Sequence, residues 1–135
     1  MHQIYQDVGL LAFLSRLVAG NFHFHLFTNN VTPDRSTVLA GLTEIAGIGA
    51  PIITVAAADF TLSGVAGHVG SFIAAPIAFL NDSGAPIDAY GYFVTDVTNA
   101  ILFAAARFDG APVNKINGES WLVTPIVGDF SQFAS

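Results

Sequence analysis

Short runs of β-forming residues, separated by turn residues, fill the chain beyond Asn21, and this pattern constrains its fold more than any other feature. In the run 22–27, apolar residues alternate with His23 and His25, which is the period of two that a β-strand produces. Turn clusters such as Asn-Asp-Ser-Gly at 81–84 separate the later runs. Repeated strands with no long helical segment between them predict a mainly β domain, an antiparallel β-sandwich of the jelly-roll-like kind. The other predicted strands are 52–55, 59–63, 71–79, 89–95, 100–108 and 120–126.

The N-terminal segment has a different period. Residues 3–18 carry apolar side chains at helical spacing, so we expect an amphipathic α-helix there. Leu10, Phe13 and Leu17 form a second apolar stripe, and a helix with two apolar faces needs a second surface to pack against. The sequence thus predicts two parts: an N-terminal helical arm over 1–19 that docks on a neighbouring molecule, and a β-sandwich domain over 20–135.

Charged residues are scarce. Only 10% of the residues are charged, against about 25% in a typical globular domain, and the net charge is −6. The four cations, Arg16, Arg35, Arg107 and Lys115, do not cluster, whereas nucleic-acid binding needs clustered cations that displace counterions from phosphates. We therefore expect no nucleic-acid partner. A surface so poor in charge predicts that much of it is covered by other protein subunits.

A membrane partner is not expected either. The longest uncharged run, 60–81, contains three glycines and Pro76, whereas a membrane-spanning helix needs about 20 predominantly apolar residues. The first residues lack the basic region of a signal peptide. The absence of cysteine excludes disulfides and thiolate chemistry.

The residues that could carry chemistry do not form a recognisable catalytic or metal-binding pattern. His23 and His25 share one face of their strand, but a metal site needs a third or fourth ligand, so we expect no metal. Ser63 lies in no Gly-x-Ser-x-Gly elbow, because Thr61 occupies the place of the first glycine. We expect no enzymatic activity and no cofactor, and we place both histidines on an exposed or interfacial face.

Arg107 stands among apolar residues and must find a partner. We expect an ion pair with Asp96 or Asp109, if the strands on either side of 96–99 form a hairpin, or with the next subunit. The residues that we expect at interfaces with other subunits are Leu10, Phe13, Leu17, His23, His25, Phe27 and Arg107.

Two longer patterns combine strand and turn residues. The first reads His-Leu-Phe-Thr-Asn-Asn-Val-Thr-Pro at 25–33 and continues with Leu-Thr-Glu at 42–44. The second reads Ala-Tyr-Gly-Tyr-Phe-Val-Thr-Asp at 89–96, followed by Ile-Leu-Phe at 101–103 and Ala-Arg-Phe at 106–108.

A third pattern closes the series, with Asn-Gly-Glu at 117–119 and Leu-Val-Thr-Pro at 122–125. In order and approximate spacing, the three patterns together resemble a widespread type of small virion protein of tailed bacteriophages. The resemblance covers most of 22–127. The chain departs from that family after Glu44, where it lacks the usual aromatic residue. The resemblance implies a β-sandwich subunit on the capsid or the tail, and no enzyme.

These observations lead to one expected function and two alternatives. We expect a capsid decoration (cement) protein on the virion surface, made in the host cytoplasm, which binds the major capsid protein and itself; capsid three-fold junctions suggest a trimer. One alternative is a tail or baseplate module that recognises host glycans through aromatic rings. The other is a carrier of apolar ligands. The rings considered for glycan binding are Tyr90, Tyr92, Phe93 and Trp121.

Overall fold

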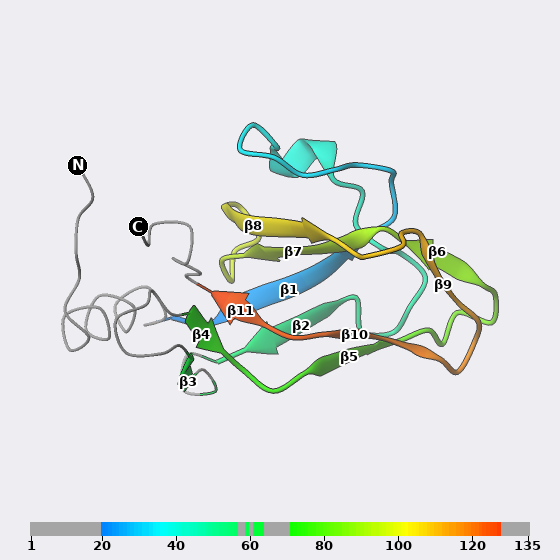
Figure 1. Ribbon diagram of the computed structural model, residues 1–135. Helices are drawn as coiled ribbons and strands as arrows, with labels where there is room; N and C mark the ends of the chain where they lie inside the picture. Colours follow the sequence, from blue (N-terminus) through cyan, green and yellow to red (C-terminus); the bar gives the residue numbers. More distant parts are fainter. Residues whose placement is uncertain (1–19, 57–58, 60, 64–70, 128–135) are drawn as a thin grey trace. The chain divides into compact units, whose positions relative to one another are not determined.

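The computed structural model in Figure 1 describes residues 20–56, 59, 61–63 and 71–127. Within these residues the chain is mainly β, every strand pair of defined register is antiparallel, and helical structure is limited to short 3-10 turns such as η1 (Leu39–Gly41). The prediction of a mainly β, antiparallel chain is confirmed. The predicted N-terminal helix lies outside the described residues.

The chain divides into two compact units. Of the described residues, unit 1 contains 20–21, 55–56, 59, 61–63, 71–76 and 124–127, and unit 2 contains Phe22–Thr54 and Ile77–Val123. No helix among the described residues is long and apolar enough to cross a membrane.

Unit 2 is built on a four-stranded sheet with the order β2-β1-β7-β8. In this sheet His25 lies opposite Phe93, and Phe93 lies opposite Ala105. The hairpin of β7 and β8 contains a β-bulge, because its register shifts between Val94 and Thr95. The four strands are β1 (Phe22–Phe27), β2 (Ile52–Val55), β7 (Gly91–Thr95) and β8 (Leu102–Arg107).

Both faces of β1 are buried, which the alternating sequence did not predict. Phe24 and Leu26 point to one face and are fully buried, whereas His25 and Phe27 point to the other and are also buried. An antiparallel strand usually leaves one face in water. Here the loop 28–45 covers the second face, where Phe27, Leu42 and Phe93 form a core.

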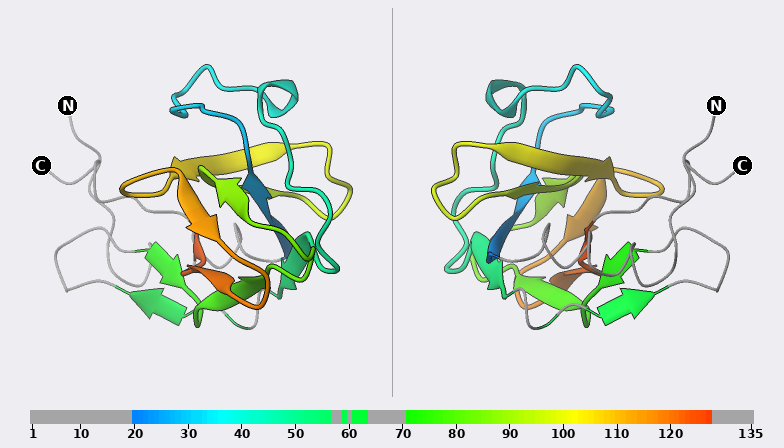
Figure 2. Two further views of the ribbon diagram at one scale, coloured as in Figure 1. Left: turned by 90° about the vertical axis from the view of Figure 1, so that its right-hand side faces the viewer. Right: turned by 90° about the vertical axis from the view of Figure 1, so that its left-hand side faces the viewer.

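Two smaller ribbons complete unit 2. Strand β5 (Ile77–Leu80) pairs with β10 (Ser120–Val123), and β6 (Ile87–Ala89) pairs with β9 (Val113–Lys115). Figures 1 and 2 show the loop 28–45 on one side of β7 and β8 and the β5–β10 ribbon on the other. This ribbon turns Phe79 and Trp121 inward, where they are buried.

Asn81 joins two of the predicted turns. Its side chain is fully buried and donates hydrogen bonds to the carbonyl oxygens of Ala85 (2.9 Å) and Lys115 (2.7 Å). Its amide oxygen accepts from the backbone N–H of Ser83, and its backbone carbonyl accepts from the N–H of Gly118. The turn clusters at 81–84 and 117–118 therefore fix each other as well as their own strands.

Unit 1 contains a three-stranded sheet with the order β11-β4-β3. The strands are β3 (Thr61–Ser63), β4 (Ser71–Ile73) and β11 (Ile126–Val127). The backbone N–H of Ala74 donates to the carbonyl of Pro125 at 3.0 Å, which extends the pairing of β4 with β11 by one residue.

Candidate functional site

His25 is the centre of the most elaborate polar cluster in unit 2. Only 2% of its surface is exposed, and its ring stacks on Phe93 with 4.5 Å between centroids and 3° between planes. Its Nδ1 lies 2.6 Å from Oε1 of Glu44, and its Nε2 lies 2.8 Å from Oγ1 of Thr95. Because a carboxylate only accepts hydrogen bonds, Nδ1 carries a hydrogen and donates it to Glu44.

The backbone of the loop 28–45 brings Glu44 to this position. The N–H of Thr28 donates to the carbonyl of Thr43 at 2.8 Å, and the N–H of Ile45 donates to that of Leu26 at 2.9 Å. These bonds place Glu44 opposite Phe27, at the end of β1. The side chain of Glu44 is 41% exposed, so its carboxylate reaches the buried imidazole from the surface.

The cluster continues beyond Thr95 toward the β7–β8 turn. The Thr95 hydroxyl donates to the backbone carbonyl of Asp96 at 2.9 Å and lies 3.2 Å from Oδ1 of Asn99. Nδ1 of His23 lies 2.7 Å from the same Asn99 oxygen. We call Glu44, His25, Thr95, Asn99 and His23 the His25 network. It ties β1, β7, the turn after β7 and the covering loop together.

The acid–imidazole–hydroxyl order of Glu44, His25 and Thr95 is that of a catalytic triad, but its surroundings are not those of an active site. Thr95 is fully buried, and its hydroxyl already bonds within the network. A substrate carbonyl cannot approach a hydroxyl in that position unless the sheet opens. What the arrangement does is hold the covering loop on the sheet and satisfy buried polar atoms. No buried side-chain nitrogen or oxygen in the described part of the chain lacks a hydrogen-bond partner.

A metal centre does not form at the histidines in the part of the chain that the structure describes, since no group of three or more His, Cys, Asp or Glu side chains is placed to hold an ion there. The rings of His23 and His25 do lie on one face, 6.2 Å apart, as the sequence predicts. The expectation that His25 is on an exposed or interfacial face is wrong, because the loop 28–45 covers it.

Arg107 has partners other than those expected. Its guanidinium donates to Oδ1 of Asn30 at 2.8 Å and to the carbonyl of Val31 at 3.0 Å, and it lies over the ring of Tyr90, 5.3 Å from the centroid. The predicted ion pair with Asp96 or Asp109 is therefore wrong within unit 2. Neutral oxygens and an aromatic face take the place of the carboxylate.

Asp96 instead organises the β7–β8 turn. Its Oδ1 accepts from the backbone N–H groups of Ala100 (2.9 Å) and Ile101 (3.0 Å), and its Oδ2 accepts from the hydroxyl of Thr98. These bonds to the charged form lower the pKa of Asp96 to about 2, with the Thr98 hydroxyl contributing most. Asp96 is a turn residue rather than a partner for a cation.

The remaining predicted interface residues are distributed as follows. Phe27 is fully buried in the core beneath the loop and offers no surface to another subunit. His23 and Arg107 are half-buried and stay predicted interface residues. Leu10, Phe13 and Leu17 lie outside the described residues.

The aromatic platform considered for glycans does not form. Trp121 is 1% exposed and Phe93 is 3% exposed, so neither presents a ring face to solvent. Tyr90 lies under the Arg107 guanidinium. Tyr92 stacks on Phe24, and its partial burial raises the pKa of its hydroxyl.

The surface carries large apolar side chains that the strand pattern did not single out. One group lies at the start of β8, and another lies on the outer face of the β5–β10 ribbon, where Leu80 and Leu122 point away from buried Phe79 and Trp121. Because side chains alternate between the two faces of a strand, the pattern along 120–126 could have identified Leu122 as an outward-facing residue. The exposed fractions are Leu122 70%, Val38 63%, Ile101 55%, Ile116 54%, Phe103 53%, Val97 52% and Leu80 47%.

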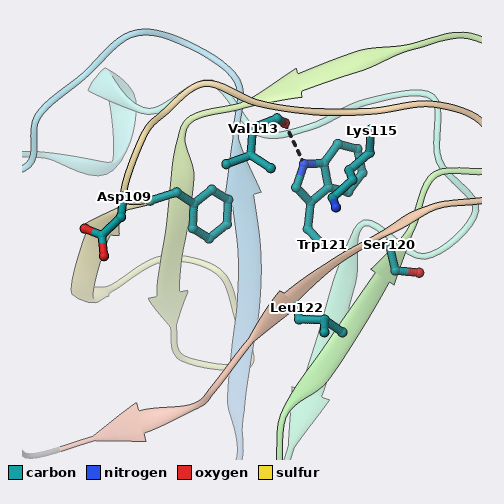
Figure 3. A pocket seen from close by; sticks show the side chains of 7 residues that line it. Asp109, Val113, Lys115, Ser120, Trp121 and Leu122 are labelled. Atoms are coloured by element: carbon teal, nitrogen blue, oxygen red, sulfur yellow. Dashed lines mark hydrogen bonds between the residues drawn. The ribbon is translucent and has the colours of Figure 1, made fainter.

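A pocket of about 300 Å³ adjoins the ribbon. Its lining includes Phe108, Val113, Lys115, Trp121 and Leu122, and Figure 3 shows the Trp121 indole N–H donating to the Val113 carbonyl at 2.9 Å in its wall. This bond uses the indole donor, and the pocket lining is mainly apolar, although Asp109, Lys115 and Ser120 also border it.

Comparison of this chain with protein-family models, curated proteins and solved structures gives no significant match in any of the three.

Proposed function

We propose that this chain is a capsid decoration protein of a tailed bacteriophage, a structural protein without enzymatic activity that stabilises the shell through apolar contacts. The observation that carries the proposal is that seven large apolar side chains of the described residues are 47–70% exposed, whereas the whole chain has only 14 charged residues. Isolated exposed apolar residues are ordinary, but here few charges lie between them to keep monomers apart.

The His25 network supports a structural role. Its side chains hydrogen-bond to one another, and the imidazole of His25 and the hydroxyl of Thr95 are buried, which favours a structural role for them. The first two sequence patterns behind the phage resemblance meet there: His25 and Glu44 come from the first, and Thr95 from the second. The finer proposal is that the two layers of unit 2 form a β-sandwich and that 1–19 is a docking arm.

We assign the contact with the major capsid protein to the outer face of the β5–β10 ribbon, where Leu80 and Leu122 are exposed and Ala78 lies opposite Leu122. About 25 cal/mol per Å² over a standard interface of about 1,600 Å² gives tens of kcal/mol before ordering costs. Repetition of the contact around a shell then multiplies a modest single-site affinity.

The test is a binding titration. Purified chain is added to shells assembled from the major capsid protein of the same phage, and bound chain is counted after sedimentation. We expect saturable binding that Leu122→Lys weakens by more than about tenfold, since it places a charge in the apolar contact. Val38→Lys, at an equally exposed apolar residue outside the ribbon, is the matched control and should bind like wild type. Equal binding of both variants contradicts the assigned surface, and no binding of the wild type contradicts the function.

The pocket supports one second candidate, a carrier of small apolar ligands. Its volume of about 300 Å³ is at the lower end of ligand sites, and its walls are mainly apolar. Native mass spectrometry of freshly purified chain decides this candidate: a carrier retains a bound small molecule, whereas a decoration protein has the mass of the polypeptide alone.

A further inference from the structure

The outer edge of β8 is the boundary of the four-stranded sheet on one side. Two backbone hydrogen bonds define which groups of β8 face β7. The N–H of Phe108 donates to the carbonyl of Tyr90 at 2.9 Å, and the N–H of Asp96 donates to the carbonyl of Ile101 at 3.3 Å. Because antiparallel strands alternate their bonding direction, the backbone groups of Ala105 and Arg107 point away from β7. No described strand pairs with them.

In the described part of the chain, this edge lacks lysine, proline and a covering segment, which are devices that usually protect an edge strand. The sequence of β8 is Leu-Phe-Ala-Ala-Ala-Arg, with no proline and no lysine. Its single charge, Arg107, is held by Asn30, Val31 and the Tyr90 ring on the loop side of the sheet. The bulge is confined to the Leu102 end, so the ladder from Ala104 to Arg107 is regular. On the opposite edge, by contrast, β2 is shorter and begins directly after Pro51.

We propose that β8 pairs antiparallel with β8 of a second copy of this chain, about a two-fold axis at Ala106. In this register the backbone N–H and C=O of Ala105 bond to those of Arg107 of the partner subunit. By symmetry, Arg107 bonds to Ala105 of the partner subunit, so both residues whose backbone groups point away from β7 are paired. Ala106 lies opposite Ala106 of the partner subunit across the axis, and these two residues share no backbone hydrogen bond. Strands approach most closely at such a pair, and the methyl group of alanine fits there.

The charges favour a second copy, and the contact area sets how strongly two copies can bind. Segment 100–108 contains no acidic residue, although the chain carries a net charge of −6, so this edge is a place where two copies meet without carboxylate repulsion. A six-residue strand is only about 20 Å long, which is less contact than a permanent dimer needs. The exposed side chains of Ile101 and Phe103 at the start of β8 add apolar area next to the ladder. The expected product is a weak, concentration-dependent dimer.

This inference deepens the self-association that belongs to the proposed function and rests on it, but it replaces the trimer expected from capsid three-fold junctions with a two-fold contact. Because the contact is defined residue by residue, it can be tested on the purified full chain without any particle. Binding to shells then decides the function separately.

The first test uses the absence of native cysteine. Ala106→Cys places one thiol at the axis, where facing Cα atoms of such a pair are about 4.5 Å apart, within the range that a disulfide spans. Under mild oxidation we expect a covalent dimer to form at least about tenfold faster than for Leu122→Cys, a matched control at a more exposed position of unit 2. Equal rates for the two variants would overturn the register.

The second test needs no substitution. Amide exchange is followed by NMR at low and at high chain concentration. We expect the amides of Ala105 and Arg107 to become protected only at high concentration, while those of Ala104 and Ala106, which face β7, are protected at both. Sedimentation of the same samples should show monomer and dimer. A trimer, or no change at Ala105 and Arg107 when the chain associates, overturns the proposal.

Discussion

The loop-covered face of the four-stranded sheet and the outer face of the β5–β10 ribbon are both rich in apolar side chains, but only the first is closed by the chain itself. Phe27 and Phe93 lie beneath the loop 28–45 and are buried. Leu80 and Leu122 have no such cover in the described part of the chain. The difference lies in the polar anchors: Glu44 reaches His25, and Asn29 bonds to Gly41 and Thr43, so the loop is fixed.

On its loop-covered face, this protein buries apolar surface by ordering a loop with hydrogen bonds. Ordering a loop of this length costs conformational entropy, which buried contacts and satisfied polar groups must offset. No loop among the described residues covers the outer face of the ribbon, so Leu80 and Leu122 are exposed there. Substitutions on the two faces should therefore affect different properties: folding on the covered face, and association on the open one.

Gly91→Ala should have the largest effect, because it breaks the covered face at its tightest point. A Cβ at this position would lie 2.1 Å from the backbone oxygen of Ala106 and 2.6 Å from the Phe27 ring. The backbone atom cannot move aside cheaply, so we expect a loss of more than about 3 kcal/mol in the free energy of unfolding. Urea denaturation measures it. Gly41→Ala, where the new methyl meets nothing within 4 Å, is the control; similar losses in both would refute the packing argument.

His25→Ala removes the centre of the His25 network and the stack on Phe93. We expect the free energy of unfolding to fall by about 3 kcal/mol, because a cavity forms beneath the loop and the Thr95 hydroxyl loses a hydrogen-bond partner. His23→Ala, two residues away on the same strand but half-buried, should cost less than about 1 kcal/mol. Thermal unfolding of the two variants gives the difference; if His23→Ala is the more damaging, the buried imidazole of His25 is not what closes this face.

Arg107→Lys tests the clamp between β8 and the loop. Lysine keeps the charge but loses the planar group over Tyr90 and the geometry that reaches both Asn30 and Val31, so we expect a cost of about 1 kcal/mol. Arg35→Lys changes an exposed arginine in the same way and should leave stability unchanged. Chemical denaturation resolves the two; equal midpoints would mean that the clamp contributes nothing.

Asp96→Asn tests the turn by its pH dependence. The folded-state pKa of about 2 is below the ordinary value of 3.8, so ionised Asp96 stabilises the folded chain above pH 4, and this contribution is lost as the pH falls toward 2. Unfolding of wild type and variant is compared at pH 5 and pH 2.5. The wild-type advantage should shrink at the lower pH, and an advantage that is the same at both would contradict the assignment.

Leu122→Lys should have the smallest effect on the free energy of unfolding and a large effect on binding to the shell. The side chain is 70% exposed, so we expect a change of less than about 0.5 kcal/mol in the free energy of unfolding. Phe79→Ala, on the inner side of the paired strand, should cost about 3 kcal/mol. Denaturation of both variants compares the two faces of one ribbon; a large loss for Leu122→Lys would show that its face is closed after all.

Much of the strand pattern could be predicted from the sequence. Strand β1 and strand β2 have the predicted bounds, because alternation and flanking turns define both ends. The predicted strand 71–79 is in fact two strands, β4 and β5, with Pro76 between them, since proline cannot donate to a ladder. Strand β9, Val113–Lys115, was missed because three residues show no period.

The contacts of the candidate site could not be predicted, because they join residues far apart in the chain. Arg107 meets Asn30, 77 residues away, whereas the expected partners Asp96 and Asp109 were chosen for closeness in sequence. His25 meets Thr95, 70 residues away. Strand alternation indicates which side chains share a face of a sheet. It does not indicate whether a loop covers that face, and His25 is buried because the loop 28–45 does so.

Counting the chain in purified particles tests whether the open apolar surface belongs in a phage shell. Particles of the phage that encodes the chain are analysed by quantitative mass spectrometry against their major capsid protein. We expect on the order of hundreds of copies per particle, because a decoration protein binds at every equivalent position of the shell lattice. A few to a few tens of copies would indicate a tail or baseplate protein instead, and absence from the particle would contradict the account.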